Sequence, residues 1–162
     1  MISKKMQSAI NEQIKYEIES SYLYLSMAAY LHSETLDGIA HWMHVQSKEE
    51  MGHAMKLFGF VIERGGTVEL QALGKPKTKW TSVTDVFADT LKHEQVVTGK
   101  IDALAKLAAK EGDLASSNLL QWFVNEQVEE ESSATKILET LKRIGEKGAG
   151  LVMLDRELAK RE

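Results

Sequence analysis

The chain contains 162 residues with an ordinary globular composition, 43% hydrophobic and 27% charged, and its length suits one domain with a sizeable core. Its net charge of −4 argues against a nucleic-acid or anionic-membrane partner and is compatible with the uptake of cations. The absence of cysteine excludes disulfides, thiolate metal sites and thiol catalysis, so any metal must be bound by oxygen and imidazole ligands.

Apolar residues recur at alternating steps of three and four along four long segments, a pattern typical of amphipathic helices. Short connections join the first helix to the second and the third to the fourth, so each pair is expected to form an antiparallel hairpin. Asp37 is expected to cap the second helix, and Ser82-x-x-Asp85 resembles a capping box at the start of the third. Together with a short fifth segment that has leucines on one face, the predicted helices cover residues 4–32, 37–64, 82–110, 113–144 and 150–160.

The connection between the second and third helices is long, from Gly65 to Thr81, and it contains the only proline, Pro76. When extended, about 16 residues reach roughly 50 Å, whereas a helix of about 27 residues is roughly 40 Å long. The connection can therefore run the length of the bundle, and the third helix can start parallel to the second. We predict an all-α fold, a four-helix bundle formed by residues 1–162 with one long crossover between helices 2 and 3 and a short fifth helix.

Both halves of the chain place metal-binding residue types on the apolar faces of the predicted helices, with the same spacing. Each half has a glutamate followed 33 residues later by an i, i+3 pair, and each member of the second set lies 77 positions after its counterpart. Within each hairpin the first and last members lie 18 residues from the middle of the turn, which puts them at matching heights in the bundle. The two sets are Glu17 with Glu50-x-x-His53, and Glu94 with Gln127-x-x-Glu130.

Carboxylates on apolar helix faces need cations. Charged side chains are rarely buried unless they are paired or bind metal, and four carboxylates at one height would otherwise repel one another or take up protons. Two divalent ions would neutralise four negative charges, so we predict a dinuclear site in which Glu50 bridges two ions, with iron or manganese favoured. The alternative interpretation is that these glutamates lie on solvated helix faces and bind nothing.

The arrangement resembles that of the ferritin family, specifically the non-haem ferritins of bacteria and archaea, over essentially the whole chain. It retains one Glu-x-x-His pair, whereas Gln127-x-x-Glu130 replaces the second such pair that bacterioferritins have. The resemblance implies a ferritin-like bundle with a catalytic iron centre whose two metal positions differ. It assigns one iron to Glu17, Glu50 and His53 and the other to Glu50, Glu94 and Glu130. It assigns to Gln127 the role of a hydrogen-bonding neighbour in the same metal site.

The same resemblance implies a third iron site beside the dinuclear centre. It would use Glu130 together with the acidic neighbours of the ligands, Glu49, Glu126 and Glu129. The alternative interpretation is that the run of glutamates at 129–131 belongs to a solvated surface.

Two aromatic residues and one methionine match positions near the centre of similar proteins. Tyr24 lies on the same helix face as Glu17 and is expected to supply an electron, with Trp122 as a second redox residue, and the alternative for both is an ordinary core position. Met51 stands where bacterioferritins bind haem. Because the second motif is not that of a bacterioferritin, no haem is expected.

The leading hypothesis is an iron-storage ferroxidase. The resemblance implies that Fe(II) is oxidised by dioxygen or hydrogen peroxide and deposited as ferric mineral inside a homo-oligomeric shell of 24 subunits. The fifth helix fits such an assembly, because its apolar face is expected to have little left to cover in its own bundle.

Two other function classes remain open. A rubrerythrin-type di-iron peroxidase or oxidase would share the metal site, although the chain lacks the cysteine pairs of a rubredoxin centre. A non-enzymatic helical interaction module would bind no stoichiometric metal. No apolar run resembles a membrane span or the core of a signal peptide, so a cytoplasmic location without a membrane partner is expected.

Overall fold

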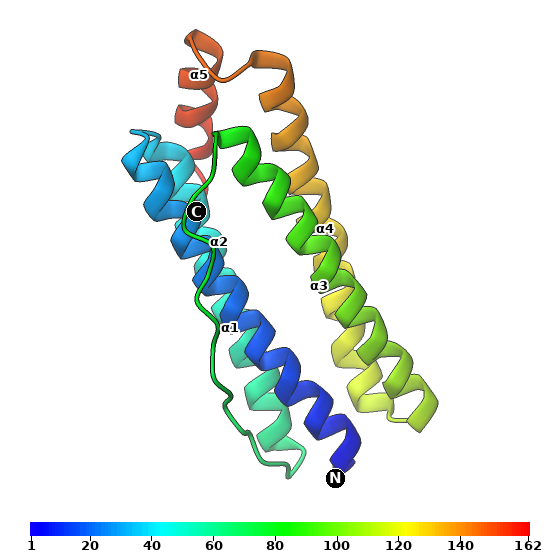
Figure 1. Ribbon diagram of the computed structural model, residues 1–162. Helices are drawn as coiled ribbons and strands as arrows, with labels where there is room; N and C mark the ends of the chain where they lie inside the picture. The colour runs from blue at the N-terminus through cyan, green and yellow to red at the C-terminus, as the bar shows by residue number, and fades with distance from the viewer.

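The computed structural model describes all of residues 1–162 and is all-α, with four long helices in a bundle and a short fifth helix at one end (Figure 1). This architecture confirms the predicted fold class, while the assignment of residues 1–162 to a single domain stays a prediction. None of the helices combines the length and the apolar character that a membrane crossing requires. The elements are α1 (Lys4–Ser33), α2 (Asp37–Glu63), α3 (Val83–Glu111), α4 (Leu114–Ile144) and α5 (Ala149–Leu158).

Side-chain caps define the start of three of the long helices. Ser3, Ser82 and Asp113 each accept a hydrogen bond from the backbone N–H three residues later, which satisfies one of the free donors of the first turn. The cap at Ser82 was predicted. The prediction that Asp37 caps α2 is wrong, because Leu36 occupies the cap position without a side-chain hydrogen bond and Asp37 is the first residue of the helix.

The segment between α2 and α3 contains no helix and runs along the bundle from one end to the other, so that α3 starts parallel to α2 (Figure 1). Hydrogen bonds hold this crossover against α1 along its length. Asn11 donates to the carbonyl of Thr67 (3.0 Å), and Ser26 donates to the carbonyl of Lys77 (2.6 Å). The predicted long crossover is therefore present and attached to one helix.

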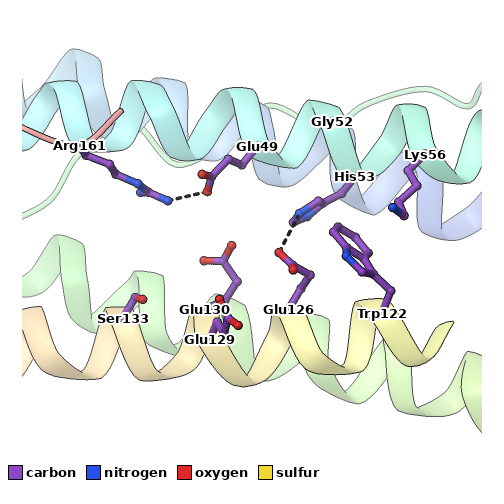
Figure 2. A pocket seen from close by; sticks show the side chains of 10 residues that line it. All are labelled: Glu49, Gly52, His53, Lys56, Trp122, Glu126, Glu129, Glu130, Ser133 and Arg161. Atoms are coloured by element: carbon purple, nitrogen blue, oxygen red, sulfur yellow. Dashed lines mark hydrogen bonds and ion pairs between the residues drawn. The ribbon is translucent and has the colours of Figure 1, made fainter. Parts of the chain in front are cut away.

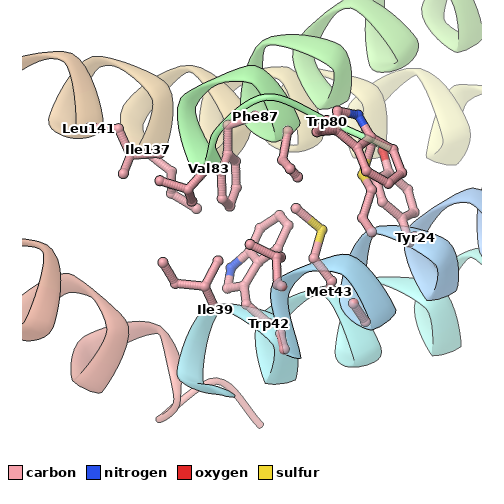
Figure 3. Close-up of a cluster of buried hydrophobic side chains, with 14 of the residues drawn as sticks. Tyr24, Ile39, Trp42, Met43, Trp80, Val83, Phe87, Ile137 and Leu141 are labelled. Carbon is pink, nitrogen blue, oxygen red and sulfur yellow. The ribbon is translucent and has the colours of Figure 1, made fainter. Parts of the chain in front are cut away.

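The hydrophobic core consists of two clusters with a polar layer between them. The first cluster lies at the end of the bundle near α5, where the rings of Trp42 and Phe87 are 5.5 Å apart (Figure 3). The second lies at the other end and includes Leu57 and Phe123. Between the clusters the apolar faces of the helices carry buried glutamates instead of hydrophobic residues, and this layer holds the candidate site.

α5 docks on the start of α2. Asp155 Oδ1 accepts a hydrogen bond from the backbone N–H of Ile39 (2.9 Å), and a Cβ at Gly38 would lie 1.9 Å from the Asp155 carbonyl oxygen, so this contact requires glycine. The prediction that the fifth helix has little to cover in its own bundle is wrong. Three partly buried leucines of α5 pack on the first cluster, namely Leu151, Leu154 and Leu158.

Candidate metal centre

The six members of the sequence repeat come from four helices and are buried together in the layer between the two clusters. None has more than 9% of its surface exposed. α1 and α3 each supply one glutamate, whereas α2 and α4 each supply two residues one turn apart. The six are Glu17, Glu50, His53, Glu94, Gln127 and Glu130. The structure thus brings together both halves of the sequence repeat.

The ligand atoms form two groups that share Glu50. In each group the side chains offer one nitrogen or oxygen atom apiece within 4.8 Å of one another, and all are buried. Glu50 Oε2 lies 3.3 Å from His53 Nδ1, whereas Oε1 accepts from Gln46, which also donates to Glu130. The two oxygens of Glu50 therefore face different groups. The groups are Glu17–Glu50–His53 and Glu50–Glu94–Glu130.

Neutral donors hold the carboxylates in place. Gln13 Nε2 donates to Glu17 Oε1 (2.8 Å), and Gln46 Nε2 donates to Glu50 Oε1 (3.0 Å) and to Glu130 Oε2 (2.8 Å). These amide donors orient the oxygens but add no positive charge. The negative charge of the layer is left for a bound cation to neutralise.

Burial shifts the acidity of these groups. Desolvation, with the charge of Glu50, raises the pKa of Glu17 to about 8. Desolvation, with the charge of Glu94, raises the pKa of Glu130 to about 7. The pKa of Glu50 is also raised well above its usual range, by burial and then by Glu94 and Glu130. Without metal, the layer therefore retains protons at neutral pH.

One buried oxygen shows that the residues fit a divalent ion. Glu17 Oε2 has no hydrogen-bond partner and lies 4.0 Å from His53 Nδ1. Buried polar atoms nearly always have a partner, and an unpaired carboxylate oxygen beside an imidazole nitrogen is a ligand arrangement. Oxygen ligands with one imidazole suit iron or manganese, as the sequence predicted.

An open cleft of about 590 Å³ adjoins the centre between α2 and α4 (Figure 2). It is lined by all of the residues predicted for a third iron, Glu49, Glu126, Glu129 and Glu130. Only the two inner groups gather three ligand atoms within 4.8 Å. Glu126 Oε2 lies 3.8 Å from His53 Nε2, which links the cleft to the centre.

Glu49 already has a positive partner in this cleft. Arg161, three residues beyond the end of α5, places Nη2 2.5 Å from Glu49 Oε2 (Figure 2). No local sequence pattern pairs these residues, because they lie 112 positions apart. A cation entering the outer position would meet the charge of Arg161.

The aromatic residues singled out from the sequence lie beside the ligands. Tyr24 is completely buried and its hydroxyl donates to Glu94 Oε1. Burial, with the charge of Glu94, raises the pKa of Tyr24 well above its usual range, so the phenol keeps its proton. Trp122 stands edge-on to His53 with ring centroids 5.5 Å apart. Met51 is exposed on the surface of the chain.

A family model described as a ferritin-like domain matches residues 7–144. The chain belongs to the ferritin family. It is 45% identical to a bacterial non-heme ferritin of Bacteroides fragilis (strain 638R) over 161 residues, which are 99% of this chain and 100% of that protein. It is 35% identical to a bacterial non-heme ferritin of Staphylococcus aureus (strain USA300), over 99% of this chain and 97% of that protein. The fold is also that of an open pore ferritin from the hyperthermophilic archaeon Archaeoglobus fulgidus, known from a crystal structure. The two chains superpose with a TM-score of 0.99 over 100% of each, and their sequences are 50% identical.

Sequence reasoning missed two donors in this ferritin, Gln13 and Gln46. Each lies four residues before a ligand glutamate on the same helix, so its side chain is on the same face one turn away. That spacing could have identified both residues. Gln127 differs from them, because its Nε2 donates only to groups on another helix, among them Glu94 Oε2 (3.1 Å).

Proposed function

We propose that this ferritin stores iron and oxidises Fe(II) to Fe(III) at a dinuclear centre. Glu50 carries the proposal, because it is the residue shared by the two groups of ligand atoms and its oxygens face different groups. The Fe(II) ligands in the first position are Glu17, Glu50 and His53. Those in the second are Glu50, Glu94 and Glu130.

Fe(II) is the substrate of the reaction. Its binding displaces the protons that the raised pKa values of Glu17 and Glu130 retain in the layer. Two Fe(II) ions then lose one electron each. Dioxygen takes up the two electrons with two protons to form hydrogen peroxide, or hydrogen peroxide takes them up with two protons to form two water molecules. Fe(III) leaves the centre and is deposited as mineral.

Tyr24 and Gln127 assist from beside the ligands in this proposal. The Tyr24 hydroxyl donates to Glu94, so the phenol proton has an acceptor when the ring supplies one of the two electrons in place of an Fe(II) ion. Gln127 is a positioning residue, because its amide holds Glu94 Oε2 and contacts Thr98 Oγ1 (3.3 Å). Gln127 is the counterpart of Glu50 in the second half of the sequence repeat. Because an amide stands there in place of a carboxylate, the two metal positions are chemically different.

The outer cleft holds a third, weaker iron in this proposal, bound by Glu49, Glu126 and Glu129 with Glu130. Its four carboxyl groups line one open space next to His53. The ion pair of Arg161 with Glu49 competes with a metal there, so occupancy requires Arg161 to move or to share Glu49.

Replacing Arg161 by glutamine should raise the Fe(II) affinity of the outer position. We expect about a thirtyfold gain, because a unit charge about 4 Å from a divalent ion at a solvated site is worth about 2 kcal/mol. The dissociation constant of the most weakly bound Fe(II) in an anaerobic titration measures the effect. Lys160→Gln is the matched control, since Lys160 is a neighbouring cation that pairs with Glu157 instead. Equal outer affinity in the Arg161 variant and the wild type would contradict the competition.

A shell of 24 identical subunits, one domain per chain and a cytoplasmic location belong to the same proposal. Several large apolar side chains on the long helices are exposed in the single chain and are available for subunit contacts. They include Tyr22, Leu25, Met51, Met55 and Val96. Burial of such surface drives stable subunit association.

An anaerobic Fe(II) titration followed by an oxygen pulse tests the function, combined with a measurement of particle size. We expect about two tightly bound Fe(II) per chain, as a two-metal site requires, then rapid oxidation and a ferric core in a large particle. Rapid oxidation by a small oligomer that forms no core would favour a rubrerythrin-type enzyme. A protein that binds no Fe(II) would be a helical interaction module, and the proposal would be wrong.

A further inference from the structure

Two histidines meet on the surface where α1 ends and α2 begins, outside the metal centre. His32 lies in the last turn of α1, and His44 lies two turns into α2. Their Nε2 atoms are 3.3 Å apart, and the ring planes are inclined by 48°. The two Nε2 atoms therefore face each other at the rim of the α1–α2 turn.

Asp37 determines which nitrogen of His32 is free. Its Oδ1 lies 2.7 Å from His32 Nδ1, so in the neutral ring Nδ1–H donates to Asp37 and the lone pair is on Nε2. This is the carboxylate–histidine arrangement that orients imidazole ligands at metal sites and makes them more basic. It also explains why Asp37 does not cap α2, since its carboxylate is engaged with His32.

His44 is available as a neutral ligand. Partial burial, and then the charges of His32, His41 and Lys48, lower its pKa from the usual value, so the ring is uncharged at neutral pH. A neutral imidazole can turn a lone pair at Nε2 toward a cation. The neighbouring Lys48 is exposed and opposes a cation only through solvent.

The separation of the two nitrogens matches a tetrahedral metal ion. Two imidazole nitrogens at 2.0–2.1 Å from zinc, at the tetrahedral angle, are about 3.3 to 3.4 Å apart. The observed 3.3 Å fits that separation, so the two nitrogens need not move apart or closer together. A square-planar ion would need the nitrogens about 2.8 Å apart, which fits less well.

We propose that His32 and His44 form a solvent-open site for a borderline divalent cation such as Zn²⁺, with water completing the coordination. The site differs in chemistry from the iron centre, which has one imidazole and several carboxylates. Two nitrogens favour borderline ions over hard ones. Zn²⁺ would thus have a binding site outside the carboxylate-rich centre. His41 is not a ligand, because its Nε2 lies 2.8 Å from the Arg161 carbonyl oxygen.

Zn²⁺ titration of the full-length apoprotein by calorimetry tests the site. Zn²⁺ also enters carboxylate centres, so the measured quantity is the difference between the wild type and His44→Gln. We expect the variant to bind one Zn²⁺ fewer per chain. His32→Gln should lose the same site, and Asp37→Asn should weaken it by about tenfold, the usual effect of removing an outer partner of a histidine ligand. His41→Gln, the matched control, should bind Zn²⁺ like the wild type.

Co²⁺ supplies a second readout that does not depend on counting sites. The wild type should show the strong visible absorption of tetrahedral Co²⁺, and His44→Gln should lose that component. Equal Zn²⁺ stoichiometry and equal Co²⁺ spectra in the wild type and both histidine variants would overturn the proposal and leave a simple His–His hydrogen bond. Loss of the site in His41→Gln would overturn the assignment of ligands. Both rings are at the surface, so the variants are expected to fold, and circular dichroism checks this.

Discussion

Glu50→Ala should abolish the fast phase of Fe(II) oxidation. Glu50 belongs to both groups of ligand atoms, so its removal takes a ligand from each metal position and also the bridge that fixes their separation. Loss of an outer partner alone costs about 10- to 100-fold at metal sites, and loss of a shared ligand should exceed about 100-fold. Stopped-flow absorbance after mixing with anaerobic Fe(II) and oxygen measures the rate.

Two further variants serve as a control and a comparison for Glu50→Ala. Glu63→Ala removes a glutamate from the exposed end of the same helix and should oxidise Fe(II) like the wild type. His53→Ala should slow the reaction through the first position, because His53 belongs to only one of the two groups. A Glu50→Ala protein that has the same helical content and particle size as the wild type and still oxidises iron rapidly would refute the assignment of the centre.

The burial of the candidate ligands at one level could be predicted from the sequence because helical geometry links position to direction. Glu17 and Glu94 lie on apolar faces of helices that pair with their neighbours through short turns, so spacing determines both the direction and the height of each side chain. Because these helix faces are apolar and pack in the interior of the bundle, the side chains on them are expected to be buried. The structure shows the same residues buried at one level between two hydrophobic clusters.

Residues whose partners come from distant segments could not be predicted in the same way. Arg161 reaches Glu49 only because α5 docks on α2, and that contact depends on the close approach of Asp155 to Gly38. Asp37 was predicted to be a cap because local sequence favours carboxylates there. His32 competes for the same carboxylate from another helix, which local sequence rules do not include.

The apoprotein should lose stability as the pH rises from 6.5 to 9. Burial raises the folded-state pKa of Glu17 to about 8 and that of Glu130 to about 7, whereas an unfolded glutamate titrates near its ordinary value. Between these values the folded state binds more protons than the unfolded state, so the free energy of unfolding falls with pH. The contribution of these groups is complete below the unfolded pKa and is lost as the pH passes through the folded values. The expected loss over this window is on the order of 2 kcal/mol per chain.

Glu17→Gln isolates the cause of this pH dependence. The amide keeps an oxygen that can accept from Gln13 Nε2 but cannot ionise, so the slope of stability against pH should become shallower than in the wild type. Thermal unfolding of both apoproteins at matched concentration between pH 6.5 and 9 measures it. His93, whose pKa burial lowers to about 4, is neutral in the folded state throughout this window and does not contribute to the folded-state change.

Metal should oppose this loss of stability with rising pH in the wild type. Zn²⁺, or Fe²⁺ without oxygen, binds the deprotonated carboxylates, so its stabilisation of the folded state grows as the pH rises. The metal-loaded protein should therefore be more stable at pH 8.5 than the apoprotein by a wider margin than at pH 6.5. Because Glu17→Gln removes the charge of one ligand, the same ions should stabilise that variant less. Equal pH slopes for the wild type with and without metal would mean that the buried carboxylates do not bind it.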